Sequence, residues 1–115
     1  MNLRRGDFPL VYFPHSDLRT VKLLSVLVVQ ADDHTTGLSQ IIVAMVSSNM
    51  RRAGHASRVA VLIKDPAASE TGLRSDSLIM TDNLATIELQ LIERRIGRMP
   101  QIEMIDLALR KTLAL

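Results

Sequence analysis

Residues 4–29, RRGDFPLVYFPHSDLRTVKLLSVLVV, contain the pattern that decides the fold. Two apolar runs rich in β-forming residues, 8–13 and 21–29, flank a polar segment of turn formers, 14–20. The second run holds four valines and three leucines, which is more than a surface strand needs. The stretch therefore predicts strand, polar loop, strand. We look for a site in this loop first, because loops between rigid strands often carry function.

Further apolar runs predict short strands at residues 41–46, 57–63, 77–80, 84–87 and 91–99. Residues 81–83 are predicted to break the sheet, and residues 67–76 to form a polar loop with a turn at Gly72. After Pro100, four apolar side chains recur at helical spacing: Ile102, Ile105, Leu109 and Leu113. The sequence thus predicts one mainly β domain over residues 1–115, a small barrel closed or flanked by a C-terminal helix.

The composition excludes several kinds of function. The chain has no cysteine, which excludes disulfides and thiolate metal sites, and its few aromatic residues argue against a platform that stacks RNA bases. No apolar run approaches the roughly 20 residues of a membrane span, and the N-terminus lacks the apolar core of a signal peptide. We expect a cytoplasmic protein without cofactor or metal. Its net charge of +2 is compatible with an anionic partner bound electrostatically.

The sequence lacks the phosphate-binding GxxxxGK[ST], the GxSxG nucleophile elbow and the zinc motif HExxH. Polar residues instead gather at predicted strand ends: 15–22 in the first loop, 47–49 after the third strand and Asp82. Taken singly, each such residue is more often a turn or capping residue than a catalyst. If they converge on one rim of a barrel, their base, cation and hydroxyl groups suit cleavage of RNA phosphodiesters without metal.

Several segments together resemble the PemK/MazF-like toxins (mRNA interferases) of bacterial type II toxin–antitoxin systems. They are RRGDFPLVYFPHSDL, KLLSVLVV, IIVAMVSSN, TGLRSDSLIMTDNLATIE and IERRIGRMPQIEMIDLALRKTL, in the family's order. The resemblance implies an SH3-like barrel, a homodimer, and a metal-independent endoribonuclease that cleaves single-stranded RNA. It also implies a cognate antitoxin that inhibits the toxin, and binding of operator DNA by the toxin–antitoxin complex.

The same resemblance suggests site residues and exposes two departures. The family's second strand begins with a catalytic Arg followed by Pro, and here this pair is Leu24-Ser25. A basic residue often precedes the family's catalytic Asp by two positions, and here Met80 precedes Asp82. The residues assigned to catalysis are Asp82, Ser47, His15 and Lys22, and those assigned to RNA binding are Arg19, Ser48, Asn49 and Arg51.

Two hypotheses follow from the missing cations, since neither Leu nor Met can stabilise a phosphorane as a guanidinium does. In the first, Lys22 or Arg19 acts as a surrogate cation and the protein is an endoribonuclease. In the second, the protein is a catalytically degenerate homologue that binds an antitoxin or nucleic acid. A nucleic-acid-binding barrel unrelated to toxins is a third, weaker alternative.

Overall fold

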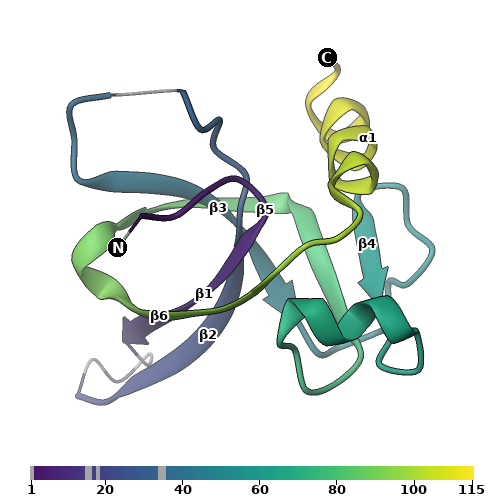
Figure 1. Cartoon of the computed structure of the whole chain (residues 1–115), viewed down its shortest axis with the longest axis horizontal. Helices are drawn as coiled ribbons and strands as arrows, with labels where there is room; N and C mark the ends of the chain where they lie inside the picture. Colours follow the sequence, from purple (N-terminus) through teal and green to yellow (C-terminus); the bar gives the residue numbers. More distant parts are fainter. Residues whose placement is uncertain (1, 15–16, 18, 34–35) are drawn as a thin grey trace.

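The structure is a computed structural model that describes residues 2–14, 17, 19–33 and 36–115. It contains a six-stranded antiparallel sheet in the order β4-β5-β3-β2-β1-β6, followed by a C-terminal helix (Figure 1). The elements are β1 Asp7–Pro14, β2 Val21–Val28, β3 Gln40–Ser47, β4 Arg58–Val61, the 3-10 helix η1 Pro66–Thr71, β5 Ser77–Glu88, the 3-10 helix η2 Leu89–Leu91, β6 Ile92–Arg98 and α1 Ile102–Leu113. The predicted fold class, mainly β with a C-terminal helix, is confirmed.

The C-terminal part of the valine-rich second strand, residues 26–28, is buried on both faces, which explains its apolar composition. Leu27 packs on one side with Phe8 and with α1, whereas Val26 and Val28 pack on the other side with Val11. Successive side chains of a strand point to opposite faces, so an almost continuous apolar run fits a strand buried on both sides. The sheet therefore curls around two hydrophobic clusters instead of presenting one face to water.

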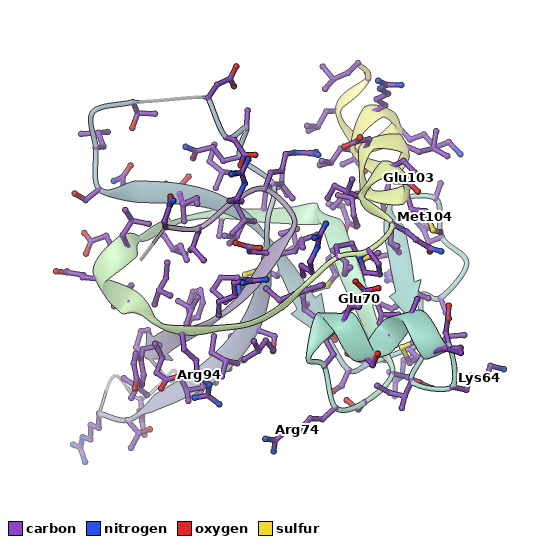
Figure 2. The ribbon with its side chains drawn as sticks, in the orientation of Figure 1. Lys64, Glu70, Arg74, Arg94, Glu103 and Met104 are labelled. Atoms are coloured by element: carbon purple, nitrogen blue, oxygen red, sulfur yellow. The ribbon has the colours of Figure 1, made fainter. Side chains whose placement is uncertain are left out.

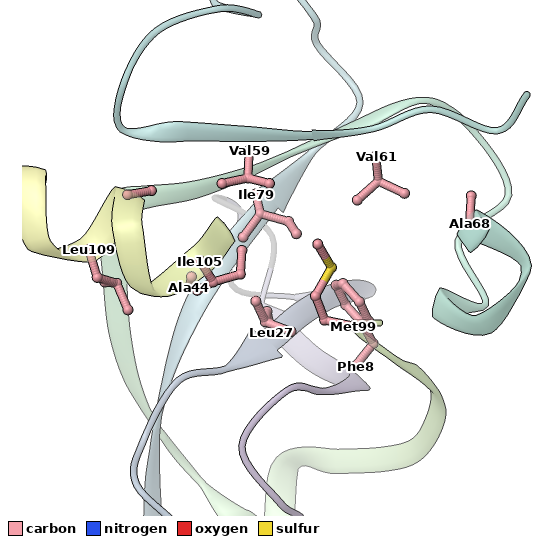
Figure 3. Packing of buried hydrophobic residues seen from close by; sticks show 11 residues of the cluster. Phe8, Leu27, Ala44, Val59, Val61, Ala68, Ile79, Met99, Ile105 and Leu109 are labelled. Atoms are coloured by element: carbon pink, nitrogen blue, oxygen red, sulfur yellow. The ribbon is translucent and has the colours of Figure 1, made fainter. Parts of the chain in front are cut away.

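The cluster under α1 draws side chains from every strand and is shown in Figure 3. Ile105 and Leu109 of α1 are buried against it as predicted, together with Ala108. Burying a side chain such as Ile105 stabilises the fold by about 1.5–3 kcal/mol. Leu113, predicted to lie on the same stripe, is 49% exposed. The C-terminal end of α1 extends away from the strands, so its last turn has little to pack against (Figure 1).

The predicted break at residues 81–83 is wrong, because β5 runs without interruption through this segment. Its pairing with β3 does shift there: Ala44 pairs with Leu84, and the next residue, Met45, pairs with Met80. Thr81 remains in the sheet because its N–H and its hydroxyl both donate to the carbonyl of Ser57, at 3.1 and 2.6 Å. A polar residue can occupy a buried strand position when its hydrogen bonds are satisfied.

Residues 67–76, predicted as a polar loop, begin instead with the helix η1. Asp65 caps its first turn by accepting a hydrogen bond from the Ala67 N–H at 3.0 Å, and Pro66 suits its first position. Gly72 ends η1 with a φ of 74°, a left-handed conformation that favours glycine, as the predicted turn there requires.

Helix η1 packs directly on β6 through two glycines. A Cβ placed at Gly97 would lie closer than 3.0 Å to the backbone of Glu70 and Thr71, and one at Gly72 would lie 2.8 Å from the carbonyl carbon of Ile96. Only residues without side chains allow the two backbones to approach this closely. In the described part of the chain, no helix is long and apolar enough to span a membrane.

Candidate functional site: a groove lined by arginine and serine

A groove lies where the β6-β1-β2 surface faces the segment between η1 and β5. It has a volume of about 690 Å³ and is lined by residues 10, 23–25, 46, 48, 72–75, 77 and 94–96. We call it the basic groove. Its two walls come from the segment after η1 and from β6, which are the two segments that the glycine contacts hold together.

The floor of the basic groove follows from strand register. Leu10 of β1 pairs with Ser25 of β2 on one side and with Arg94 of β6 on the other. Paired residues of neighbouring antiparallel strands point to the same face, so Arg94, Leu10 and Ser25 form a row across the sheet. The backbone positions of Arg94 and Ser25 are thus about 10 Å apart, which is two strand spacings.

Three arginines line the groove, and they differ in their partners. Arg94 contacts the carboxylate of its neighbour Glu93 at 2.5 Å, but its side chain is 54% exposed. Arg95 forms an ion pair with Asp7, with 3.2 Å between Nε and the carboxylate oxygen, and its Nε donates to the Gly97 carbonyl at 3.3 Å. Arg74 forms no ion pair with any described residue. In the view of Figure 2, Arg74 lies between Arg94 at the lower left and Lys64 at the lower right. An exposed ion pair such as Glu93–Arg94 contributes little, so Arg94 remains available to an anion.

Hydroxyl groups are the other polar side chains of the groove: Ser25, Ser48, Ser75 and Ser77. Ser77 is buried, and its hydroxyl donates to the carbonyl of Ser75 at 2.9 Å, which stabilises the groove wall formed by the segment after η1. No carboxylate or imidazole is among the described residues that line the groove. Across the described ranges there is also no group of three His, Asp or Glu side chains placed to share a metal ion.

The residues predicted after the third strand lie beside the groove, and Ser48 lines it. The hydroxyl of Ser47 accepts a hydrogen bond from the N–H of Asn49 at 3.0 Å. The side-chain oxygen of Asn49 in turn accepts from the N–H of Arg51 at 3.0 Å. Ser47 and Asn49 thus stabilise the turn that positions Ser48, as short polar side chains often do.

Asp82, predicted to be catalytic, does not line the groove. Arg58 of β4 holds its carboxylate with two hydrogen bonds, from Nε at 2.7 Å and from a terminal nitrogen at 3.2 Å. These hydrogen bonds hold the pKa of Asp82 below its usual value of 3.8. A carboxylate that is ionised so firmly is a poor proton donor at neutral pH.

The predicted residues of the first loop are not drawn into the groove where the structure describes them. Lys22 lies opposite Phe13 near the end of the hairpin and is absent from the groove lining, whereas Leu23 and Leu24 line it. Arg19 donates its backbone N–H to Asp17 at 2.9 Å in an exposed turn. His15 lies outside the described residues.

Arg74, Arg94 and Arg95 were not among the predicted site residues. The sequence shows Arg94-Arg95 as one of several basic clusters, for which solvated faces are the usual explanation. What singles out Arg94 is its pairing with Leu10, a contact between residues far apart in the chain. The sequence feature that could have identified Arg94 and Arg95 as site residues is their position inside a predicted strand.

Comparisons with known proteins agree with the fold. The chain matches the family model described as PemK-like, MazF-like toxin of type II toxin-antitoxin system over residues 4–113. No curated protein matches the chain.

Solved structures resemble the chain over almost its full length. Mycobacterium tuberculosis toxin MazF-mt6 has a TM-score of 0.68 and 24% identity, covering 93% of this chain and 97% of that one. An endoribonuclease in complex with its cognate antitoxin from Mycobacterial species has a TM-score of 0.71 and 19% identity, covering 98% and 96%. The MazE-MazF structure from Deinococcus radiodurans has a TM-score of 0.74 and 12% identity, covering 100% and 98%. Identities this low show the fold alone, but the family model spans nearly the whole chain, and the protein therefore belongs to the PemK-like, MazF-like toxins of type II toxin–antitoxin systems.

Proposed function

We propose that this protein is the toxin of a toxin–antitoxin pair and cleaves single-stranded RNA without a metal ion, and that the basic groove holds the RNA. The observation that carries the proposal is the set of three arginines in the groove beside Leu24. In this proposal Leu24 stands where the family's catalytic Arg is expected from the resemblance in sequence. Arg94 supplies a guanidinium group from β6 and Arg74 supplies one from the segment between η1 and β5, so they are the surrogate cations in place of Lys22 and Arg19.

In the proposed reaction the 2′-oxygen attacks the adjacent phosphorus, and the bond from phosphorus to the 5′-oxygen breaks. The products are a 2′,3′-cyclic phosphate and a free 5′-hydroxyl. Arg94 and Arg74 stabilise the phosphorane charge, and the Ser48 hydroxyl orients a phosphate oxygen. A base must remove the 2′-hydroxyl proton and an acid must protonate the leaving oxygen. His15 remains the candidate for this proton transfer on the sequence alone.

A catalytically degenerate homologue is the second candidate. It is favoured by one observation: no carboxylate or imidazole lines the groove among the described residues. Such a protein would bind RNA or an antitoxin in the groove without cleaving RNA. Ser47 and Asp82 would then have structural roles, in the turn after β3 and in the pair with Arg58.

We further propose that a cognate antitoxin inhibits the protein by laying a disordered segment along the basic groove, in competition with RNA. One of the similar structures is an endoribonuclease in complex with its cognate antitoxin. In this proposal the toxin is a homodimer in the cytoplasm, and operator DNA is bound only by the toxin–antitoxin complex.

The test is cleavage of a long single-stranded RNA by the purified protein in EDTA, with both ends of each product mapped. Arg94→Ala removes the cation in the row with Leu10 and Ser25, and Lys64→Ala is the control that removes an exposed charge away from the groove (Figure 2). Losing one group that stabilises the transition-state charge lowers kcat by about 100-fold. We expect that loss for Arg94→Ala and unchanged cleavage for Lys64→Ala.

Two further outcomes would contradict parts of the proposal. If the native protein makes no cuts but Leu24→Arg does, the protein is a degenerate homologue whose scaffold still supports catalysis. If Arg94→Ala cleaves as fast as the native protein, the surrogate role of Arg94 is refuted.

A further inference from the structure

A second cavity lies beside the start of α1, separate from the lining of the basic groove except at one residue. It has a volume of about 280 Å³, and its lining includes four arginines and one carboxylate, Arg4, Arg5, Arg95, Arg98 and Asp7. We call it the arginine cavity. We infer that it binds a phosphate group of the same RNA strand that occupies the basic groove. This inference rests on the proposed function and adds a second contact point for the RNA.

The charge of the cavity is only partly neutralised by the protein. Asp7 is 8% exposed; its carboxylate accepts a hydrogen bond from the backbone N–H of Arg4 at 2.8 Å and forms an ion pair with Arg95. The Arg5 side chain already has two protein partners: it donates to the Val29 carbonyl at 2.9 Å and forms an ion pair with Asp106 at 2.7 Å.

Three arginines of the cavity keep guanidinium donors available for an anion. Arg98 has no ion-pair partner among the residues that the structure describes. The side chain of Arg4 is 73% exposed and lies 3.5 Å from Asp32, a pair too exposed to hold it firmly. Arg95 uses its Nε, which donates to the Gly97 carbonyl and contacts Asp7, so its terminal nitrogens stay available. Guanidinium groups bind phosphate oxygens with two parallel hydrogen bonds, which makes phosphate the fitting anion.

Arg95 lines both the basic groove and the arginine cavity, so the two sites meet at β6. β6 is an edge strand of the sheet, and η1 packs against it at Ile96 and Gly97, between Arg94 and Arg98. From Arg94 to Arg98 the strand rises about 13 Å. Phosphates follow one another about every 3.4 Å along one strand of double-helical DNA, and at that spacing about four nucleotides connect the two positions. An RNA strand that leaves the basic groove over Arg95 thus carries a phosphate to Arg98.

The test compares binding of oligouridines of three and nine nucleotides at several salt concentrations. The trimer fills the basic groove alone, and the nonamer reaches the arginine cavity. We expect Arg98→Ala to weaken nonamer binding about tenfold and to leave trimer binding unchanged. The slope of log affinity against log salt should fall by about 0.7 for the nonamer, the value for one phosphate contact on a single strand. Arg98→Lys, which keeps the charge, should retain most of the affinity.

Arg94→Ala separates this inference from the proposed function. If Arg94→Ala weakens both RNAs and Arg98→Ala weakens neither, the groove binds RNA and the second phosphate site is refuted. If Arg98→Ala weakens the trimer and the nonamer equally, the arginine cavity is not a separate contact and the inference also fails. If Arg98→Ala weakens only the nonamer while Arg94→Ala changes nothing, the phosphate site stands and the groove proposal fails. Lys64→Ala serves again as the charge-matched control.

Discussion

Replacing Gly97 with alanine tests the contact that holds the two walls of the basic groove together. Gly97 lies in β6, and the added methyl group would lie closer than 3.0 Å to backbone atoms of Glu70 and Thr71. Gly97 is not among the glycines with a positive φ, so alanine meets no conformational penalty of its own there. The variant therefore isolates a steric effect between β6 and η1.

The expected magnitude follows from what surrounds the new methyl group. Overpacking a core usually costs about 1–3 kcal/mol, with the lower values where a side chain can rotate away. Here the nearest atoms belong to the backbone of η1, so relief requires that η1 and β6 separate. We expect a loss of about 3 kcal/mol in the free energy of unfolding, which lowers Tm by about 10 °C for a domain of this size. Affinity for RNA should fall too, because both walls of the groove move.

The assay is urea unfolding followed by circular dichroism, with Gly54→Ala as the comparison. Gly54 has a φ of 93° and no neighbour within 4 Å of a built Cβ, so its alanine variant has backbone strain without a clash. That strain costs about 1–2 kcal/mol. If Gly97→Ala proves no less stable than Gly54→Ala, or keeps full stability while RNA affinity is unchanged, the packing argument for the groove walls is wrong.

Two further predictions concern the polar contacts of β5. The Arg58 guanidinium lowers the folded-state pKa of Asp82 below 3.8, so the stabilisation by Asp82 is present above that value and lost as pH falls through the lowered pKa. The difference in unfolding free energy between the native protein and Asp82→Asn should thus be constant above about pH 5 and shrink below pH 4. A difference that grows on acidification would contradict the stabilising role of the Asp82–Arg58 ion pair. Thr81→Val removes a buried hydroxyl that donates to the Ser57 carbonyl and lies 2.9 Å from the hydroxyl of Thr112 in α1. It should cost about 1–2 kcal/mol in urea unfolding, and a neutral result would show that this link to α1 contributes nothing.

Local patterns in the sequence sufficed for most of the fold. The valine-rich run of β2 and the helical spacing of Ile105 and Leu109 were enough to predict that these residues are buried. Both patterns involve only residues that are close together in the sequence. The prediction for residues 81–83 was wrong because the conformation of this segment depends on a contact with a residue far away in the sequence. Thr81 looks like a loop residue, and its place in a buried strand depends on the carbonyl of Ser57, which only the folded sheet brings near.

The candidate site was harder to predict, because its cations come from segments that meet only in the folded sheet. Ser48 could be found from its position after a predicted strand, and it lines the groove. Arg74 and Arg94 could not be found this way, since their nearness to Leu24 depends on the pairing of β6 with β1 and on the packing of η1. Asp82 was chosen from a family pattern, and its pair with Arg58 needs the β4–β5 register.

The two edge strands of the sheet make poor templates for strand addition by another chain. β4 has only four residues, and β6 shifts register twice against β1 and carries charged side chains along its length. Short length, bulges and charge are the features by which proteins prevent edge-to-edge aggregation. A partner peptide would gain few main-chain hydrogen bonds at either edge. Its affinity for this protein must then come from side chains, so recognition depends on the partner's sequence more than on its capacity to extend a sheet.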